Sequence, residues 1–242
     1  MRILVVSDLH YTLKQLDWVA SVAAEYEVVV IAGDLLDIAS AVDPDAQIAV
    51  VLEYLARMSD KTTVVVCSGN HDLNSLNELN ERAACWLDGA TPSRVFVDGT
   101  RVELDGLLIS VCAYWDGPRS RELVATQLDE DARLLGDQLW LWAYHAPPDD
   151  SPTSWTGSRH YGDEDLSAWI ARHQPGVVLC GHVHQSPFVE GGNWVDEIGS
   201  TSVFNAGRQI GPVPTHIVID TELMLARWSC TEGVEEHALA AN

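Results

Sequence analysis

The chain has 242 residues, a length that suits one α/β domain with a sizeable core. It carries 14 Lys and Arg against 36 Asp and Glu, a net charge of -22, and no apolar run reaches the roughly 18 residues of a membrane helix. This composition argues against a membrane-spanning protein and against a long nucleic acid as partner, because nucleic acid binding depends on basic side chains. We expect a cytoplasmic protein, since no signal peptide follows Met1 and the five cysteines form no CxxC pair.

The first third of the chain alternates apolar runs with helical patterns. Residues 3–6, 28–32 and 63–67 are short runs rich in β-branched side chains, which is typical of buried strands. Between them, residues 13–25 and 46–58 repeat apolar side chains at helical spacing. This strand–helix–strand alternation predicts parallel βαβ units.

The middle of the chain changes character, with three strand candidates close together at residues 94–97, 101–104 and 107–113. The dipeptides Asp98-Gly99 and Asp105-Gly106 divide them, and both are hairpin turn signals. A polar helix is predicted next, over residues 119–135.

The last part predicts strands over 139–144 and 177–180 with a helix over 164–173 between them. The tail adds four strand candidates in hairpin-like pairs, at residues 193–198, 202–205, 216–220 and 223–228. We therefore predict one domain over residues 1–242, of the α/β (α+β) class, with two sheets sandwiched between helices.

Polar side chains follow five of these strands, at the point where each strand ends. In chain order they are Asp8, His10, Asp34, Asp37, Asn70, His71, Asp72, His145, His182 and His184. In open α/β sheets the functional crevice lies at the carboxyl ends of the strands, so we expect these side chains to converge on one rim. Glycines precede Asp34, Asn70 and His182, which fits tight turns that let the backbone approach a bound group.

Seven of these residues have the chemistry of metal ligands: Asp8, His10, Asp34, Asn70, His145, His182 and His184. Carboxylates left without a counter-charge would repel one another, and bound cations remove this cost. A donor set of imidazole, carboxylate and amide without thiolate suits Mn, Fe, Zn, Co or Ni rather than a closed structural zinc site. Seven ligands exceed the needs of one ion, so they predict two divalent cations, about 3.5–4 Å apart and bridged by one carboxylate.

Each of these pieces also has an ordinary structural explanation when it is taken alone. Asp8 and His10 could begin a turn or helix, Gly33-Asp34 is a turn dipeptide, and the two histidines of the GHVH stretch could be a hydrogen-bonded pair. Chance rarely places such groups after five strands in succession. The metal interpretation is therefore favoured.

Five motifs, D-x-H, G-D-x-x-D, G-N-H-D, a lone H and G-H-x-H, occur in this order as DLH, GDLLD, GNHD, YHAPP and GHVH. In this respect the chain resembles the calcineurin-like metallophosphoesterase superfamily, from Asp8 to His184, about three quarters of its length. The resemblance is to the small single-domain, bacterial-type members. It implies a four-layer αββα sandwich of two mixed β-sheets flanked by helices.

The resemblance also implies a role for each motif residue. Asp8, His10 and His184 would hold one metal, Asn70, His145 and His182 the other, and Asp34 would bridge the two. His71 would be a catalytic residue that faces the substrate, with Asp72 keeping its imidazole oriented. Asp37 would fix the orientation of a ligand from outside the coordination sphere.

The implied reaction is hydrolysis of a phosphoester. The two cations bind phosphate oxygens and lower the pKa of a bridging water, and the resulting hydroxide attacks phosphorus in line. His71 would protonate the leaving oxygen or stabilise the transition state. We predict a dinuclear metal-dependent phosphodiesterase whose substrate is a small phosphoester such as a cyclic nucleotide.

Two other functions fit the same motifs. A phosphomonoesterase or protein phosphatase is the alternative enzyme, and a protein-binding scaffold of the same fold is the non-catalytic alternative. A scaffold need not keep seven ligands together with His71, and this chain has them all. The sequence leaves the natural substrate, the metal identity and the oligomeric state open.

Substrate contacts are expected from the loops near the predicted site. Arg208 and Arg159 are candidates for binding the phosphate, with solvated surface charge as the alternative. Two predicted loop regions, residues 114–136 and 146–163, contain four aromatic side chains that could stack on a base or serve core or lid packing: Tyr114, Trp115, Trp155 and Tyr161. Four histidines match no motif and are expected on the surface or in ordinary hydrogen bonds: His160, His173, His216 and His237.

Overall fold

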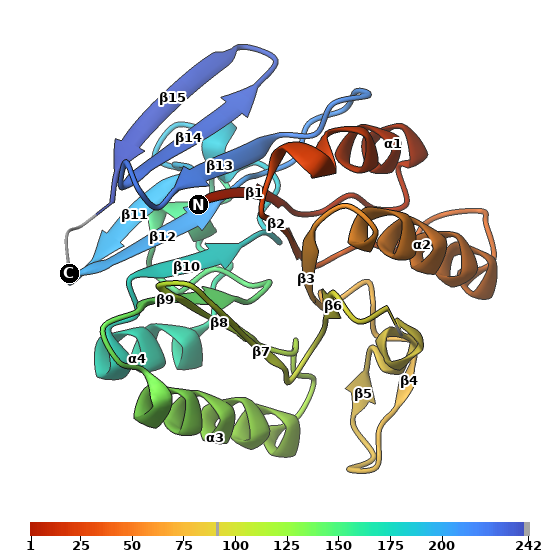
Figure 1. The fold of residues 1–242 in the computed structure, drawn as a ribbon, viewed down its shortest axis with the longest axis horizontal. Helices are drawn as coiled ribbons and strands as arrows, with labels where there is room; N and C mark the ends of the chain where they lie inside the picture. Colours follow the sequence, from red (N-terminus) through yellow and green to blue (C-terminus); the bar gives the residue numbers. More distant parts are fainter. Residues whose placement is uncertain (91, 240–242) are drawn as a thin grey trace.

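Two mixed β-sheets stack face to face, with helices on their outer faces, in the computed structural model, which describes residues 1–90 and 92–239. The four helices are α1 (Leu13–Val22), α2 (Pro44–Ser59), α3 (Pro118–Leu134) and α4 (Glu164–His173). Helices α1 and α2 lie on one side of the stacked sheets, and α3 and α4 lie on the other (Figure 1). The predicted four-layer αββα sandwich is therefore confirmed.

The seven-stranded sheet has the order β15-β14-β13-β1-β2-β3-β6. Its strands are β1 (Arg2–Val6), β2 (Val28–Ala32), β3 (Thr63–Cys67), β6 (Val95–Phe96), β13 (His216–Asp220), β14 (Leu225–Cys230) and β15 (Gly233–Ala238). The first four run parallel to one another, while β13, β14 and β15 add antiparallel neighbours. The βαβ units predicted for the first third of the chain are present.

The six-stranded sheet has the order β11-β12-β10-β9-β8-β7. Its strands are β7 (Arg101–Leu104), β8 (Leu107–Val111), β9 (Leu139–Ala143), β10 (Val177–Cys180), β11 (Val195–Ile198) and β12 (Thr201–Asn205). The inner strands β8, β9, β10 and β12 run parallel, and β7 and β11 are antiparallel edges. Both sheets thus gather the carboxyl ends of their central strands at one rim.

Side-chain alternation along each strand builds the layers. On β1, Ile3 and Val5 enter the core between the sheets, whereas Leu4 and Val6 pack toward α1 and α2. A separate core lies between the six-stranded sheet and helices α3 and α4. Strands that are covered on both faces need apolar residues at every position, which explains their Val-rich and Ile-rich runs. A core shared by both sheets supports one domain over residues 1–242, which stays a prediction.

One of the two predicted hairpins is wrong. Asp105-Gly106 does join the antiparallel strands β7 and β8. Asp98-Gly99, in contrast, separates β6 in the seven-stranded sheet from β7 in the six-stranded sheet, so the chain crosses between the sheets at this point. Instead of closing a hairpin, the Asp98 carboxylate accepts a hydrogen bond of 2.8 Å from the backbone N–H of Ser68.

The prediction also omitted several short elements. They are the small hairpin β4 (Ser75–Leu76) and β5 (Arg82–Ala83), the strand β15, and the 3₁₀ turns at Ala23–Glu25, Cys85–Gly89, Pro152–Ser154 and Ser186–Phe188. Strand β15 is mostly exposed at the sheet edge and lacks the apolar alternation that marks a buried strand. Pairing with β14 holds it in place.

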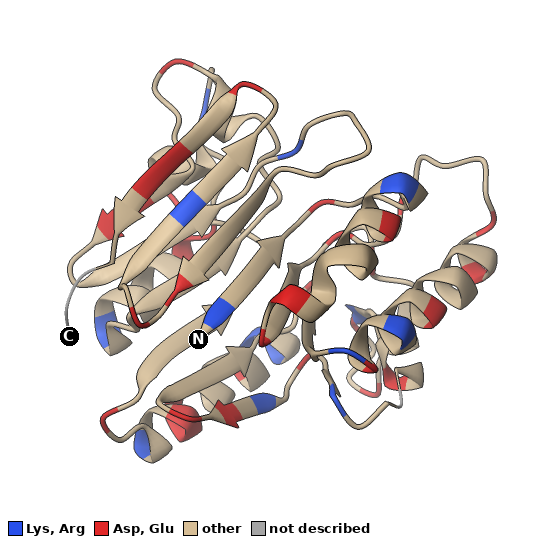
Figure 2. Ribbon diagram, turned by 45° about the horizontal axis from the view of Figure 1, so that its top comes forward, with Lys and Arg blue, Asp and Glu red and all other residues tan. Residues whose placement is uncertain are grey.

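Acidic residues are spread over the helices and over loops at many points of the chain (Figure 2). Lys and Arg positions are scattered along the same ribbon (Figure 2). Among residues 1–90 and 92–239, no helix has both the length and the apolar character needed to cross a membrane.

Candidate metal centre

The predicted convergence at the strand ends is found in the structure. The Nε2 atoms of His10 and His184 lie 3.0 Å apart, and His184 Nε2 lies 3.2 Å from Asp8 Oδ1. Asp34 Oδ2 is 3.6 Å from His10 Nε2. One ligand atom from each of these four residues lies within 4.8 Å of all the others, a geometry that fits one cation.

A second group adjoins the first through Asp34. Its carboxylate Oδ2 is 3.3 Å from His145 Nε2. The Oδ1 atom of Asn70 lies 2.8 Å from His182 Nδ1, and the rings of His145 and His182 have centroids 5.1 Å apart. Asp34 therefore stands between the two groups, at the position where a bridging ligand would lie.

The backbone at these strand ends is held in unusual conformations. Asp8, His10, Asp34 and His182 all have positive φ angles, of 54°, 42°, 53° and 67°. For a residue other than glycine this left-handed conformation costs about 1–2 kcal/mol. Strain of this kind persists where the surrounding structure enforces it, commonly at functional sites. The sharp turns aim four ligand candidates, which follow three different strands, at one point.

Two glycines make room for the ligand candidates. Gly33 has φ +86°, and a Cβ atom added to it would collide with the imidazole of His145. A Cβ atom at Gly69 would collide with the carboxylate and backbone of Asp34. The glycines of the GD and GN motifs are thus required because another ligand packs directly against their Cα atoms.

The charges of the two buried carboxylates are balanced by histidines. Burial would raise the pKa of Asp34, but the adjacent His145 holds it well below its usual range. Burial would likewise raise the pKa of Asp8, and the bond to His184 outweighs this and lowers it. Both carboxylates are therefore ionised at neutral pH, the form that binds a cation.

The histidines respond to the same balance. Burial lowers the pKa of both His10 and His182 to about 4, so both rings are neutral at pH 7. Burial also lowers the pKa of His145, but the Asp34 carboxylate prevails and raises it to about 9. A proton on His145 thus supplies positive charge beside Asp34 that a bound cation would replace.

His145 carries the clearest sign that the residues fit a metal. Its Nδ1 bonds to the carbonyl oxygen of Ala32 at 2.8 Å, which fixes the ring and leaves Nε2 facing Asp34. This buried Nε2 has no hydrogen-bond partner among residues 1–90 and 92–239. Metal-ligating histidines commonly anchor one ring nitrogen to a backbone carbonyl and give the other to the metal. The donor set and its geometry fit divalent cations.

His71 lies at the edge of this cluster. Its ring meets that of His10 edge-on with centroids 4.4 Å apart, and its backbone N–H donates to Asp34 Oδ1 at 2.8 Å. The N–H of Ile38 donates to His71 Nδ1 at 3.3 Å, and the Asp37 carboxylate lies 3.8 Å from the same nitrogen. Because Nδ1 accepts, Nε2 carries the proton of the neutral ring.

Comparison with known proteins agrees with this geometry. A family described as calcineurin-like phosphoesterase matches residues 1–186. The chain belongs to the calcineurin-like phosphoesterase family. The predicted resemblance is thus confirmed, and membership supports an enzyme that hydrolyses phosphoric esters.

Several solved structures share the fold of this phosphoesterase. A dimetal phosphatase from Danio rerio has a TM-score of 0.61 at 12% identity, over 100% of this chain and 99% of the other. TT1561 of Thermus thermophilus has a TM-score of 0.59 at 15% identity, over 98% of both chains. GAP50, the anchor in the inner membrane complex of Plasmodium, has a TM-score of 0.56 at 10% identity, over 100% and 89%. No curated protein sequence matches the chain.

Asp72 has partners other than the expected one. Its fully buried carboxylate accepts hydrogen bonds from the backbone N–H groups of Leu35, Leu36 and Gly69, at 2.8–3.4 Å. It therefore ties the GDLLD loop to the GNHD loop. Asp37 is the carboxylate beside the His71 imidazole, the place in which the sequence had suggested Asp72. Burial and the charge of Asp34 raise the pKa of Asp72 to about 7.

The candidate substrate residues lie around the centre rather than within it. Arg208 is half-buried, and its backbone N–H donates to the carbonyl oxygen of His184 at 3.0 Å. Arg159 is exposed and stacks over Tyr161 at 5.3 Å, and the Tyr161 ring lies 5.3 Å from that of His182. Tyr114 also borders His182, with ring centroids 6.3 Å apart. Tyr161, Arg159 and Tyr114 thus border the centre on the His182 side.

The four histidines outside the motifs have ordinary polar contacts. Hydrogen-bond partners are Ser154 and Ser151 for His160, Pro214 for His216 and Glu197 for His237, while His173 Nε2 lies 3.2 Å from the Asp129 carboxylate as an ion-pair contact. The aromatic residues Trp115 and Trp155 serve packing: Trp115 stacks on Tyr144 at 4.5 Å, and Trp155 Nε1 donates to the Glu190 carbonyl.

Proposed function

We propose that this chain is a dinuclear metal-dependent phosphodiesterase that acts on a small phosphoester. The observation that carries the proposal is the pair of ligand groups that share Asp34. One group comprises Asp8, His10, Asp34 and His184, and Asn70, His145 and His182 adjoin it on the other side of Asp34. A bridging carboxylate between two cation sites is the layout of two-metal phosphoryl hydrolases.

Each predicted ligand keeps its role in this proposal. Asp8, His10 and His184 would hold one divalent cation, Asn70, His145 and His182 would hold the other, and Asp34 would bridge them. Mn, Fe, Zn, Co and Ni all accept such donors. When bound, the two cations would neutralise charge on the phosphoryl oxygens and increase the acidity of the attacking water.

The chain itself would supply the proton for the leaving group. The protonated His71 ring would pass its Nε2 proton to the leaving oxygen and become the neutral imidazole. Asp37 lies 3.8 Å from Nδ1 and would stabilise positive charge on the imidazole, while Asp72 would hold the loop that carries His71. General acid catalysis of this kind contributes about 10²–10⁴ in rate.

The surroundings of the centre favour a diester over a monoester. His71 borders the ligands beside His10, whereas Tyr114, Tyr161 and the adjacent Arg159 border them beside His182. A diester has two substituents and could engage both sets of side chains. A monoester, the substrate of the phosphomonoesterase or protein phosphatase alternative, has one substituent and would contact only one of these two sets of side chains. A monoester dianion would also add negative charge to an acidic protein.

The same reasoning extends to the partners and the compartment. A small phosphoester, such as a cyclic nucleotide, is proposed as the substrate because the net charge of -22 would repel a long polyanion. The five cysteines are all free, which supports the expected cytoplasmic location.

A non-catalytic scaffold remains the second candidate, because GAP50, a structure with this fold, is an anchor. A scaffold has no need for a carboxylate shared by two ligand groups or for a histidine placed beside them. The presence of both in this chain favours the enzyme.

The test is a substrate panel before and after metal removal. Chelated protein should not hydrolyse bis-p-nitrophenyl phosphate, a cyclic nucleotide or p-nitrophenyl phosphate, and re-addition of Mn, Fe, Zn, Co or Ni should restore hydrolysis. We expect a higher kcat/KM for the diesters. A tenfold preference for p-nitrophenyl phosphate, about 1.4 kcal/mol in the barrier, would promote the phosphatase alternative. Absence of hydrolysis with every metal would favour the scaffold.

A further inference from the structure

A pocket of about 270 Å³ begins at the His71 side chain. One part of its lining comes from residues 36–47, where α2 begins, and the other from residues 71–82, which include β4 and β5. None of the seven ligand candidates lines it. The volume lies just below the roughly 300–1,000 Å³ of typical small-molecule pockets, so the pocket has room for one ring-sized group.

Arg82 places a cation in this pocket. Its Nη2 donates to the carbonyl oxygen of Leu73 at 3.0 Å, which holds the guanidinium beside the GNHD loop. Its other N–H groups have no acceptor within residues 1–90 and 92–239. An arginine with one nitrogen anchored and the others free is suited to bind an oxygen of a ligand.

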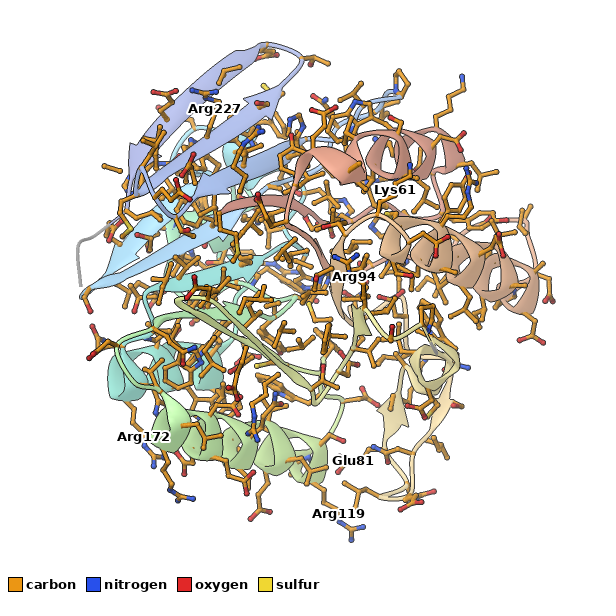
Figure 3. The ribbon with its side chains drawn as sticks, in the orientation of Figure 1. Lys61, Glu81, Arg94, Arg119, Arg172 and Arg227 are labelled. Carbon is orange, nitrogen blue, oxygen red and sulfur yellow. The ribbon has the colours of Figure 1, made fainter. Side chains whose placement is uncertain are left out.

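The segment that carries Arg82 is fixed to the rest of the protein. Glu81, the preceding residue, accepts hydrogen bonds from the backbone N–H groups of Arg119 and Ser120 at 3.0 and 2.7 Å. Figure 3 shows Glu81 and Arg119 near each other at the start of α3. The Arg119 guanidinium in turn donates to the Leu79 carbonyl at 3.2 Å. These contacts place Arg82 on an anchored hairpin rather than on a free loop.

Besides Asp37 and Gln47, two more polar side chains line the pocket, and they differ in kind. Asn74 Oδ1 accepts from the N–H of Trp86 at 3.3 Å, so its amide nitrogen stays available as a donor. Asp45, in the first turn of α2, supplies acceptor oxygens. A hydroxyl group can both accept from Arg82 or Asn74 and donate to Asp45. An anionic ligand would meet the Asp45 carboxylate, and a cationic one would meet Arg82.

We propose that this pocket holds the leaving group of the substrate and selects a polyhydroxylated alcohol, such as a glycerol or sugar moiety. The inference rests on the proposed function, because His71 lines the pocket and would protonate the departing oxygen. In the reaction the P–O bond to the polyol breaks and an oxygen from water bonds to phosphorus. The proton of His71 Nε2 passes to the polyol oxygen.

The experiment compares two diesters of the same chain length, bis(glyceryl) phosphate and di-n-propyl phosphate. With both metals bound, the wild type should show a kcat/KM at least about tenfold higher for the glyceryl diester. Arg82→Gln should remove most of this preference, mainly through KM. Asp45→Asn should act in the same direction. Arg133→Gln, at an exposed position on α3, is the matched control. It should change neither the preference for the glyceryl diester nor the hydrolysis of bis-p-nitrophenyl phosphate.

Three outcomes would overturn the inference. The wild type could fail to prefer the glyceryl diester, Arg82→Gln could behave like Arg133→Gln, or Arg82→Gln could slow all substrates equally. Failure of the proposed function looks different, because no metal would then support hydrolysis of bis-p-nitrophenyl phosphate. If Arg82→Gln does not fold, Asp45→Asn still tests the inference. Asp45 takes no part in the hydrogen bond from Arg82 to the Leu73 carbonyl, so its substitution leaves that bond in place.

Discussion

Gly33→Ala is the substitution that most directly tests how the centre is assembled. Gly33 has φ +86°, and an added Cβ atom would collide with the ring of His145. The imidazole would have to move, and its 2.8 Å bond to the Ala32 carbonyl would break. Gly106→Ala is the matched control, because Gly106 has φ +75° and a Cβ atom there would touch nothing within 4 Å.

The two substitutions differ by a calculable amount. Both incur the cost of the left-handed conformation, about 1–2 kcal/mol. Gly33→Ala also breaks the hydrogen bond between the His145 ring and the Ala32 carbonyl. Leaving these buried polar groups unpaired lowers the free energy of unfolding by about 1–3 kcal/mol more. For a chain of this size each kcal/mol lowers the melting temperature by about 2–4 °C. Gly33→Ala should therefore melt about 2–12 °C below Gly106→Ala.

Thermal unfolding of the metal-free proteins and elemental analysis of the metal-loaded ones would measure both effects. Gly106→Ala should keep the wild-type metal content, since it lies at the far end of β8 from the centre. Gly33→Ala should bind less metal, because His145 is displaced. Equal melting temperatures and equal metal contents in the two variants would refute the account of Gly33.

Two further substitutions separate the bridge from the proton donor. Asp34→Asn keeps an acceptor for the His71 N–H but removes the shared charge, so metal content should drop and kcat/KM should fall by more than the roughly 10–100-fold typical of changes outside the coordination sphere. A variant with two metals and near wild-type turnover would contradict the bridging role. His71→Ala should lower kcat by about 10²–10⁴ with metal content unchanged, and metal loss from the purified variant would make His71 a ligand.

Most of the ligand candidates could be predicted because their signals are local and repeated. Each stands directly after a run such as 3–6 or 28–32, and parallel strands bring their carboxyl ends to one rim. The left-handed turn at Asp34 is marked in the sequence by the glycine before it. Local pattern and topology together were therefore sufficient to predict that residues as far apart as Asp8 and His182, 174 positions, lie in contact.

The partner of His71 could not be predicted in this way. Adjacent residues point in different directions, and Asp72 turns into the protein to accept three backbone N–H groups. Asp37 reaches His71 from another loop, 34 positions earlier in the chain. The spacing of the GDLLD motif could have indicated Asp37, since it lies on the loop that carries Asp34. Nothing in the local sequence indicates the role proposed for Arg82, which depends on its bond to the Leu73 carbonyl.

The error at Asp98-Gly99 has a related cause. An Asp-Gly pair fits a two-residue hairpin, and the identical pair at Asp105-Gly106 does form one. At Asp98 the carboxylate instead bonds the N–H of Ser68, whose Oγ accepts from the N–H of Tyr114 at 3.0 Å. A long-range contact outweighs the local turn preference, and the chain passes from one sheet to the other.

This partly buried contact leads to a prediction about the pH dependence of stability. Burial, partly offset by the hydrogen bonds from Ser68, raises the pKa of Asp98 to about 6, against 3.8 for an ordinary Asp side chain. The folded state therefore holds the Asp98 proton more tightly than the unfolded state does. Protonated Asp98 therefore contributes to the free energy of unfolding. This contribution is fully present below about pH 4 and is lost as the pH rises through about 6, an effect of at most about 3 kcal/mol.

Asp98→Asn keeps an acceptor for the Ser68 N–H but cannot ionise, so its free energy of unfolding should lack this loss. Denaturant unfolding of both metal-free proteins between pH 4 and 8 gives the difference between variant and wild type, in which the titrations common to both cancel. That difference should rise in favour of Asp98→Asn from about pH 4 to 6 and then level off. If the difference stays constant with pH, Asp98 has the same pKa in the folded and the unfolded chain. If the difference falls as the pH rises, the Ser68 bond stabilises the carboxylate more than burial destabilises it. Either result would contradict the prediction.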